Sequence, residues 1–251
     1  MHSTLFKIFG IPIRSYGLMM VVGFSIGLWR VLRVSRKRGI EPDRIYDLAL
    51  VVLISGILGA RLIYVLLNPQ TESMRNFVEV WNGGLSFHGG IFAAVIACAI
   101  YTRAIKLQFW KCADLLIPSV AIGYAFTRIG CFLNGCCYGC PTSLPWGIRF
   151  SEHGALTPPS HPTQIYAALI NLLIFFILTR LEKMHRAPGF VFVSYLGLYG
   201  IYRFMIEFLR AGFSAQLWAL GLTQAQGVSL LMIAVCAVVL VTVYRKPVKE
   251  I

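Results

Sequence analysis

The sequence contains few charged residues, and acidic residues are the scarcest of them. Only 13% of its 251 residues are Asp, Glu, Lys or Arg, and Asp and Glu together number 10. Soluble domains carry about 25% charged residues, so this composition excludes an ordinary soluble globular protein. Hydrophobic residues make up 57% of the chain and the mean hydropathy is +0.72. We therefore expect an integral membrane protein.

Other features are also missing. The sequence has no hydrophilic stretch long enough for a second core, no internal repeat and no low-complexity segment. We therefore expect one polytopic membrane domain over residues 1–251. Met1–Ser15 lacks the apolar core and small-residue cleavage site of a signal peptide, so none is expected. The net charge of +13 would suggest nucleic-acid binding in a soluble chain. In a membrane protein, the excess of Lys and Arg in cytoplasmic loops explains such a net charge, so no nucleic-acid partner is expected.

Long apolar runs dominate the rest of the sequence. A transmembrane helix needs about 20 predominantly apolar residues. Seven segments meet this requirement, near Tyr16–Val34, Tyr46–Leu67, Phe87–Arg103, Ala113–Leu133, Thr163–Leu181, Gly189–Leu209 and Thr223–Tyr244. The sequence therefore predicts an all-α membrane protein with seven transmembrane helices.

Basic residues alternate between loops. The loops after the first, third, fifth and seventh segments are rich in them, for example Arg36, Lys106, Lys183 and Lys246. Loops 69–84 and 134–162 contain one arginine each, Arg75 and Arg149. Because cytoplasmic loops carry the excess of Lys and Arg, the N-terminus is predicted outside and the C-terminus in the cytoplasm. Residues 134–162 then form a short outer loop.

Ionisable residues interrupt the apolar segments at matching depths. With this orientation they fall in the outer half of the bilayer, together with Tyr16 and His88 at segment starts: Arg61, Arg128, Arg203, Glu207 and Arg210. A charge within the membrane costs about 2.5–3.5 kcal/mol on insertion scales, so a functional role is the first hypothesis. The structural alternatives are an Arg203–Glu207 ion pair between helices and snorkelling of Arg128 to the headgroups.

The excess of positive charge favours function. Four arginines face one glutamate, so we expect an anion, and a phospholipid phosphate is available at that depth. The planar guanidinium binds phosphate oxygens in pairs. Gly89 and Gly90 allow close approach of a ligand, and His88 is a candidate proton acceptor. We expect Tyr16, His88 and three of the charged residues to face one cavity, namely Arg128, Arg203 and Glu207, with the last two paired.

Four of the seven cysteines follow the Arg128 segment closely: Cys131, Cys136, Cys137 and Cys140. Four thiols close together suggest a metal or cluster site, which is the first interpretation. Their C-x4-C-C-x2-C spacing, however, does not match the paired CxxC motifs of zinc knuckles. A disulfide at an oxidising outer face is a second interpretation. We favour a third, in which the cysteines are small residues packed in a tight turn. No metal or other cofactor is expected to be required.

Several short motifs occur in a fixed order along the chain. They are Ser15-Tyr16-Gly17-Leu18, Gly59-Ala60-Arg61, the Gly83–Gly90 run, Arg128-Ile129-Gly130 with Asn134-Gly135, His161-Pro162-Thr163-Gln164, and Tyr199-Gly200 leading to Arg203 and Glu207-Phe208-Leu209-Arg210. In these motifs the chain resembles the bacterial prolipoprotein diacylglyceryl transferases. The family motif usually reads Arg-x-Gly-Asn-Phe-x-Asn-Gly-Glu, and here Cys131 and Cys136 replace the first Asn and the Glu.

The resemblance implies both a reaction and roles for residues. The family moves the diacylglyceryl group of phosphatidylglycerol to the lipobox cysteine of a prolipoprotein signal peptide, forms a thioether and releases glycerol phosphate in the bacterial inner membrane. By likeness, Arg128 binds the lipid phosphate, and His88 and Arg203 are needed for activity, with Tyr16 and Glu207 at matching positions. The remaining candidates for substrate binding are Arg61, Asn134, Gly89, Gly90 and Arg210.

Three alternatives remain open from the sequence. The first is a related membrane lipid transferase with a different acceptor, which the cysteines at positions 131 and 136 suggest. A non-catalytic lipid-binding or transport protein is the second, although repeats and broken helices, which transporters often show, are not evident. A membrane redox protein using the cysteines is the third.

Overall fold

The computed structural model describes residues 4–8, 11–69, 77, 84–152, 155–184, 186–210, 217–219 and 221–244. Arg75, Gly83 and the basic residues that follow Tyr244 lie outside the described residues. What the sequence predicts for these residues remains a prediction. The orientation of the two termini across the membrane also remains a prediction.

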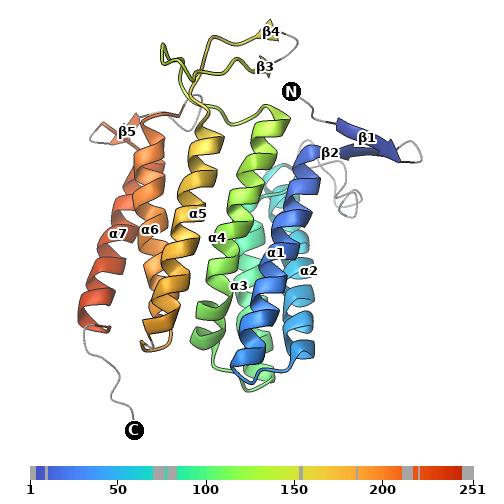
Figure 1. The fold of residues 1–251 in the computed structure, drawn as a ribbon, viewed down its shortest axis with the longest axis vertical. Coiled ribbons are helices and arrows are strands. Elements are labelled where there is room, and N and C mark those ends of the chain that lie inside the picture. The colour runs from blue at the N-terminus through green and yellow to red at the C-terminus, as the bar shows by residue number, and fades with distance from the viewer. Residues whose placement is uncertain are drawn as a thin grey trace. The chain divides into compact units, whose positions relative to one another are not determined.

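The chain is mainly helical (Figure 1). Seven helices in the described part are long and apolar enough to cross a membrane. They are α1 (Ser15–Lys37), α2 (Pro42–Leu67), α3 (Phe87–Ala104), α4 (Phe109–Asn134), α5 (Thr163–Leu181), α6 (Phe190–Glu207) and α7 (Gln224–Thr242). The prediction of a seven-helix membrane protein is confirmed, and the predicted boundaries agree to within about one helical turn.

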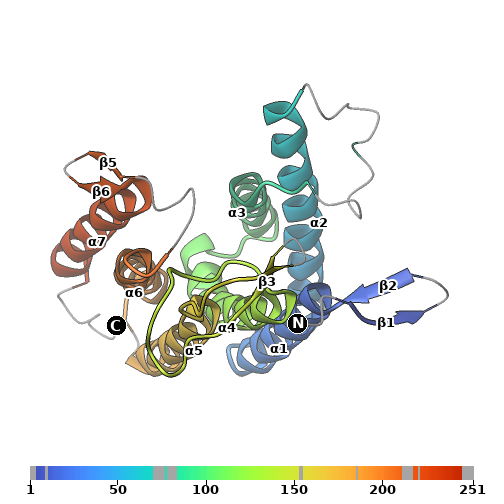
Figure 2. The same cartoon turned by 90° about the horizontal axis from the view of Figure 1, so that it is seen from above.

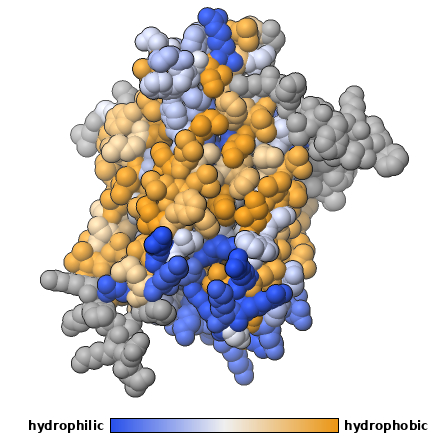
Figure 3. Space-filling model, in the orientation of Figure 1, coloured by the Kyte–Doolittle hydropathy of each residue, from blue (hydrophilic) through white to orange (hydrophobic). Residues whose placement is uncertain are grey.

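Short elements join the helices. The strands of the described residues pair into three antiparallel hairpins, β1 (Thr4–Ile8) with β2 (Ile11–Arg14), β3 (Ser151–Glu152) with β4 (Ala155–Leu156), and β5 (Leu217–Ala219) with β6 (Leu222–Thr223). A 3-10 helix, η3 (Glu182–Met184), extends α5. On the face shown in Figure 3, hydrophobic residues cover the middle of the helices and hydrophilic residues gather at the helix ends. This is the pattern that a lipid environment requires of helices.

The helices belong to two compact units. Unit 1 contains residues 1–30 and 113–251, and unit 2 contains residues 31–112. That the chain behaves as one membrane domain remains a prediction from the sequence.

In unit 2, glycines allow α2 and α3 to lie side by side (Figure 2). A Cβ added at Gly59 would lie 2.2 Å from Cβ of Ala93, and one at Gly89 would lie 2.5 Å from the carbonyl oxygen of Gly59. The Ser86 N–H donates to the carbonyl of Ala60 at 2.9 Å. Small residues at such a crossing bring helix backbones together, which is how helices associate where lipid removes the hydrophobic drive.

Gly59→Ala is expected to destabilise the protein by about 1–3 kcal/mol, because the added methyl group must push α3 away. Thermal unfolding in mild detergent measures the change. Gly227→Ala is the matched control, because a Cβ added there has no neighbour within 4 Å. Alanine also favours helix over glycine, so the control should be neutral or stabilising. Equal unfolding midpoints for the two variants would refute the packing role of Gly59.

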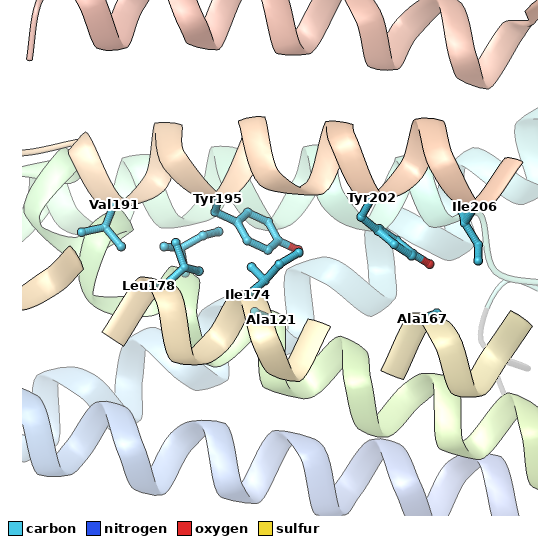
Figure 4. Close-up of a cluster of buried hydrophobic side chains, with 9 residues drawn as sticks. Ala121, Ala167, Ile174, Leu178, Val191, Tyr195, Tyr202 and Ile206 are labelled. Atoms are coloured by element: carbon cyan, nitrogen blue, oxygen red, sulfur yellow. The ribbon is translucent and has the colours of Figure 1, made fainter. Parts of the chain in front are cut away.

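In unit 1, the core lies between α4, α5 and α6. Figure 4 shows side chains of α6 that point toward α5, among them Val191, Tyr195 and Ile206. The first turn of α6 is fixed by Asp114 of α4, whose carboxylate accepts from the N–H groups of Gly189 at 2.7 Å and Phe192 at 2.8 Å. An acidic side chain at a helix N-terminus satisfies free N–H groups and complements the helix dipole.

At one end of unit 1, the starts of α1, α5 and α7 meet the ends of α4 and α6, and we call this the Arg128 end. Residues 135–152 and 155–162 fold over the end of α4 and the start of α5 (Figure 1). Phe150 in this connection is fully buried, and its ring stacks on Tyr138 with centroids 4.7 Å apart. Its ring also meets Phe132 of α4 edge-on at 6.2 Å. The connection is therefore an ordered cap on the helices.

Candidate active site

Arg128 is held on α4 by a tyrosine one turn earlier. Its guanidinium lies over the Tyr124 ring, 4.7 Å from the centroid, and its Nη2 donates to the Tyr124 hydroxyl. Its Nε is buried and has no hydrogen-bond partner, and no carboxylate in the described residues forms an ion pair with it. A buried donor without a partner is costly, so this cation is suited to an anion from outside the chain.

Arg203 is neutralised within its own helix. Its Nη1 forms an ion pair with Glu207, whose side chain is fully buried, as the sequence predicted. The other carboxylate oxygen of Glu207 accepts from the Thr223 hydroxyl at 3.2 Å. Thr223 also caps α7 in a reciprocal arrangement with Gln226. The pair therefore links the end of α6 to the start of α7, and Arg128 is left as the less neutralised cation.

Tyrosines connect the two arginines. The ring centroids of Tyr124, Tyr199 and Tyr202 are 5.7–6.3 Å apart in edge-on pairs. The Tyr199 hydroxyl lies within electrostatic range of both Arg128 and Arg203. Arg128 and Arg203 thus border one aromatic cluster. Sequence reasoning missed Tyr124 and Tyr202, although the four-residue spacing from Tyr124 to Arg128 places both on one helix face.

Three further predicted residues lie at the Arg128 end. Tyr16 is 36% exposed and within electrostatic range of Arg128. A Cβ added at Gly130 would lie 3.2 Å from the Cα of Tyr16, so that glycine lets α1 approach α4. The Nε of Arg210 is buried without a partner, like that of Arg128. Asn134 is exposed at the last residue of α4. Unit 1 therefore gathers six predicted site residues: Tyr16, Arg128, Asn134, Arg203, Glu207 and Arg210.

The cysteine turn borders the same residues. The Sγ atoms of Cys131, Cys136 and Cys137 all lie within 4.8 Å of one another, whereas Cys140 is not in this group. The pKa of the Cys137 thiol is lowered, because the thiols of Cys131 and Cys136 hydrogen-bond to it and Arg128 and Arg210 favour its thiolate.

The other predicted residues belong to unit 2. His88 is exposed in the first turn of α3, with its ring 5.8 Å from that of Phe87. The Ser86 hydroxyl caps this helix by accepting from the N–H of Gly89 at 3.4 Å. Gly89 and Gly90 also pack against α2. That His88 and the Arg128 end face one cavity remains a prediction.

Arg61 has partners that the sequence did not indicate. It is only 1% exposed and donates to the carbonyl oxygens of Phe77 at 3.3 Å and Gly84 at 3.2 Å. Its guanidinium also lies 5.7 Å from the Tyr64 ring centroid. These contacts give Arg61 a bracing role between α2 and the backbone of Phe77 and Gly84. Its predicted contact with substrate remains a prediction.

Known proteins resemble the chain over nearly its whole length. The model of the family described as prolipoprotein diacylglyceryl transferase matches residues 3–242. A phosphatidylglycerol–prolipoprotein diacylglyceryl transferase of Clostridium tetani is 36% identical over 215 residues, which cover 84% of this chain and 86% of that protein. A protein of the same name from Finegoldia magna is 33% identical over 249 residues, covering 98% and 97%. Another from Vibrio atlanticus is 33% identical over 255 residues, covering 97% and 91%.

Proposed function

Because the chain belongs to the prolipoprotein diacylglyceryl transferase family, we propose that it lipidates the lipobox cysteine of prolipoprotein signal peptides in the bacterial inner membrane. The reaction in its relatives' names, transfer of a diacylglyceryl group from phosphatidylglycerol to a prolipoprotein, is the activity of this multi-pass membrane protein. The lipobox acceptor, the membrane and the roles of individual residues are our proposals.

The observation that carries the site is that no carboxylate in the described part of the chain forms an ion pair with Arg128. Its neighbour Arg203 already has a carboxylate, whereas the buried Nε of Arg128 has no partner in the described residues. The phosphodiester of phosphatidylglycerol carries one negative charge and oxygens that match the guanidinium fork. Tyr124 fixes the orientation of that fork. Arg128 therefore binds the lipid phosphate in this proposal.

The chemical step is a displacement at a glyceryl carbon. The thiolate of the acceptor cysteine attacks the carbon bonded to the phosphate oxygen, so a C–S bond forms and a C–O bond breaks. Glycerol phosphate leaves with the bonding electrons. Negative charge grows on the departing phosphate, and Arg128 and Arg203 stabilise it. Glu207 occupies only part of the five N–H donors of Arg203, so others remain for the phosphate.

The thiol proton needs an acceptor, because the thiolate is the nucleophile. We assign this role to His88, the exposed histidine at the start of α3, with Tyr16 as a relay near Arg128. A positioned general base of this kind contributes about 100- to 10,000-fold to rate.

The experiment that tests the function is a transfer assay with purified protein, phosphatidylglycerol and a lipobox peptide. Mass spectrometry of the peptide and release of glycerol phosphate are measured together. His88→Gln should lower the rate about 100-fold or more, because no base accepts the thiol proton. Ile96→Val, at an exposed position about two turns further along α3, is the matched control and should retain the wild-type rate.

Each arm of the assay can contradict the proposal. A wild-type protein that releases glycerol phosphate without modifying the peptide would contradict the lipobox acceptor. A His88→Gln variant with the wild-type rate would contradict the base.

A further inference from the structure

We propose that the thiols of Cys131, Cys136 and Cys137 form a binding site for a thiophilic metal ion, with Zn²⁺ as its simplest occupant. The three Sγ atoms lie within 4.8 Å of one another, and those of Cys136 and Cys137 are 3.6 Å apart. Zinc binds thiolates at about 2.3 Å in a tetrahedron, which places the sulfurs about 3.8 Å apart. The spacing of the three thiols therefore fits such an ion with small side-chain adjustments.

The end of α4 explains why two of the thiols meet. The N–H of Cys136 donates to the carbonyl of Cys131 at 3.1 Å, and the N–H of Gly135 donates to that of Phe132 at 3.0 Å. Gly135, which precedes Cys136, has a left-handed φ of +77°. This is a Schellman cap, in which the residues at the positions of Cys131 and Cys136 are brought into contact. Two apolar residues would satisfy the same cap, so this pair alone does not indicate a ligand.

Cys137 is the residue that packing does not explain. It is exposed, and its φ of +65° is a backbone conformation that side-chain-bearing residues seldom adopt. The first turn of α5 holds this conformation. The Thr163 hydroxyl donates to the carbonyl of Cys137 at 2.9 Å, and Nε2 of Gln164 donates to that of Cys136 at 2.7 Å. The third thiol is therefore fixed beside the other two rather than buried as an apolar side chain.

The surrounding charge suits a thiolate site. Arg128 and Arg210 both lie within electrostatic range of Cys137. Three thiolates around Zn²⁺ carry a net charge of −1, which nearby guanidinium groups stabilise. Arg210 has a buried Nε without a partner and can serve this charge, so Arg128 remains available to another anion.

Binding at this site involves no redox change. Each protonated ligand exchanges its S–H bond for an S–Zn bond, and its proton passes to solvent. The exposed side of Cys137 leaves the fourth position of the ion open to water. The site does not depend on the proposed transferase mechanism, because it uses none of the residues assigned to the chemical step as ligands.

The test measures metal binding by the full-length protein in detergent. In one separate sample the free thiols are blocked at lysis, so that they can be counted. Metal-free protein is titrated with Zn²⁺ against a competing indicator, and with Co²⁺ to record thiolate-to-metal charge-transfer absorption. We expect one ion per chain and an absorption typical of tetrahedral thiolate coordination. Cys137→Ser should weaken Zn²⁺ binding more than about 100-fold, since even outer-shell changes cost 10- to 100-fold.

Cys140→Ser is the matched control from the same connection. The Cys140 thiol donates to the carbonyl of Arg210 at 2.9 Å and is outside the three-thiol group, so this variant should bind like the wild type. Zn²⁺ should also raise the unfolding temperature of the wild type and of Cys140→Ser, but not of the triple variant Cys131→Ser/Cys136→Ser/Cys137→Ser.

Three results would overturn the site. One is equal Zn²⁺ binding by the wild type and the triple variant, which would mean adventitious metal. Another is a Co²⁺ complex without thiolate absorption. The third is a disulfide that involves Cys131, Cys136 or Cys137, found by mass spectrometry after the thiols have been blocked at lysis in denaturant and a chelator, which frees any thiol that a metal ion protects.

Discussion

Arg128→Ala is expected to lower the rate of diacylglyceryl transfer about 100- to 1,000-fold, the range found when a donor to a developing anion is removed. The reason is that this guanidinium has a buried donor with no partner in the described residues, and no carboxylate among them forms an ion pair with it. Transfer to a lipobox peptide is measured at saturating and limiting phosphatidylglycerol. The loss should appear in both kcat and kcat/KM, because the phosphate carries most charge in the transition state.

Two further variants sharpen this result. Arg128→Lys should recover little activity, because an ammonium group cannot make the paired hydrogen bonds of the fork. Arg180→Ala removes an exposed arginine from the last turn of α5 and should leave the rate unchanged. Equal amounts of all variants in the membrane fraction exclude an insertion defect. A near-normal transfer rate in Arg128→Ala would contradict the proposal that Arg128 binds the lipid phosphate.

Glu207→Ala is expected to destabilise the protein by about 3–5 kcal/mol, because removal of one partner leaves the other charge uncompensated in a buried place. The variant also takes away the acceptor of the Thr223 hydroxyl, which is one of the links between α6 and α7. Chemical unfolding in mild detergent measures the change. Thr223→Val is the control, because it keeps both charges and removes only the hydrogen bond to Glu207 and the cap on the Gln226 N–H, each worth about 1 kcal/mol.

A double variant separates stability from chemistry. Arg203→Met/Glu207→Leu removes both charges together, and apolar replacements of a buried ion pair are often neutral or stabilising. Its stability should therefore exceed that of Glu207→Ala, while its transfer rate stays low because Arg203 is absent. A double variant with wild-type activity would show that the pair is only a link between helices.

The seven helices could be predicted because lipid imposes a length and a composition on each of them. The boundaries differ where polar residues continue a helix. For example, α2 begins at Pro42, a residue type favoured in the first helical turn, rather than at Tyr46. The hairpins were not predicted, because strands of two to five residues leave little pattern in a sequence.

The site was partly readable from spacing along one helix. The Arg203–Glu207 pair follows from a separation of four residues on α6. The partners of Arg61 did not follow from the sequence, because they are backbone carbonyls set by the path of a connection. The meeting of Cys137 with Cys131 did not follow from the sequence, because it depends on a left-handed backbone conformation at Cys137 that the first turn of α5 holds.

The arrangement of partners along the chain has a consequence for biosynthesis. Arg203 and Glu207 are made four residues apart in one helix, so they can enter the bilayer as a neutral pair. Arg128 enters with α4, where Tyr124 is its partner and no carboxylate of the described chain pairs with it. The cost of inserting this charge, about 2.5–3.5 kcal/mol, must therefore be offset by the apolar residues of α4 itself. The ribosome makes Arg128 before Tyr199 and Tyr202 of α6, so α4 enters the translocon with Tyr124 as the one tyrosine of the later cluster beside its arginine.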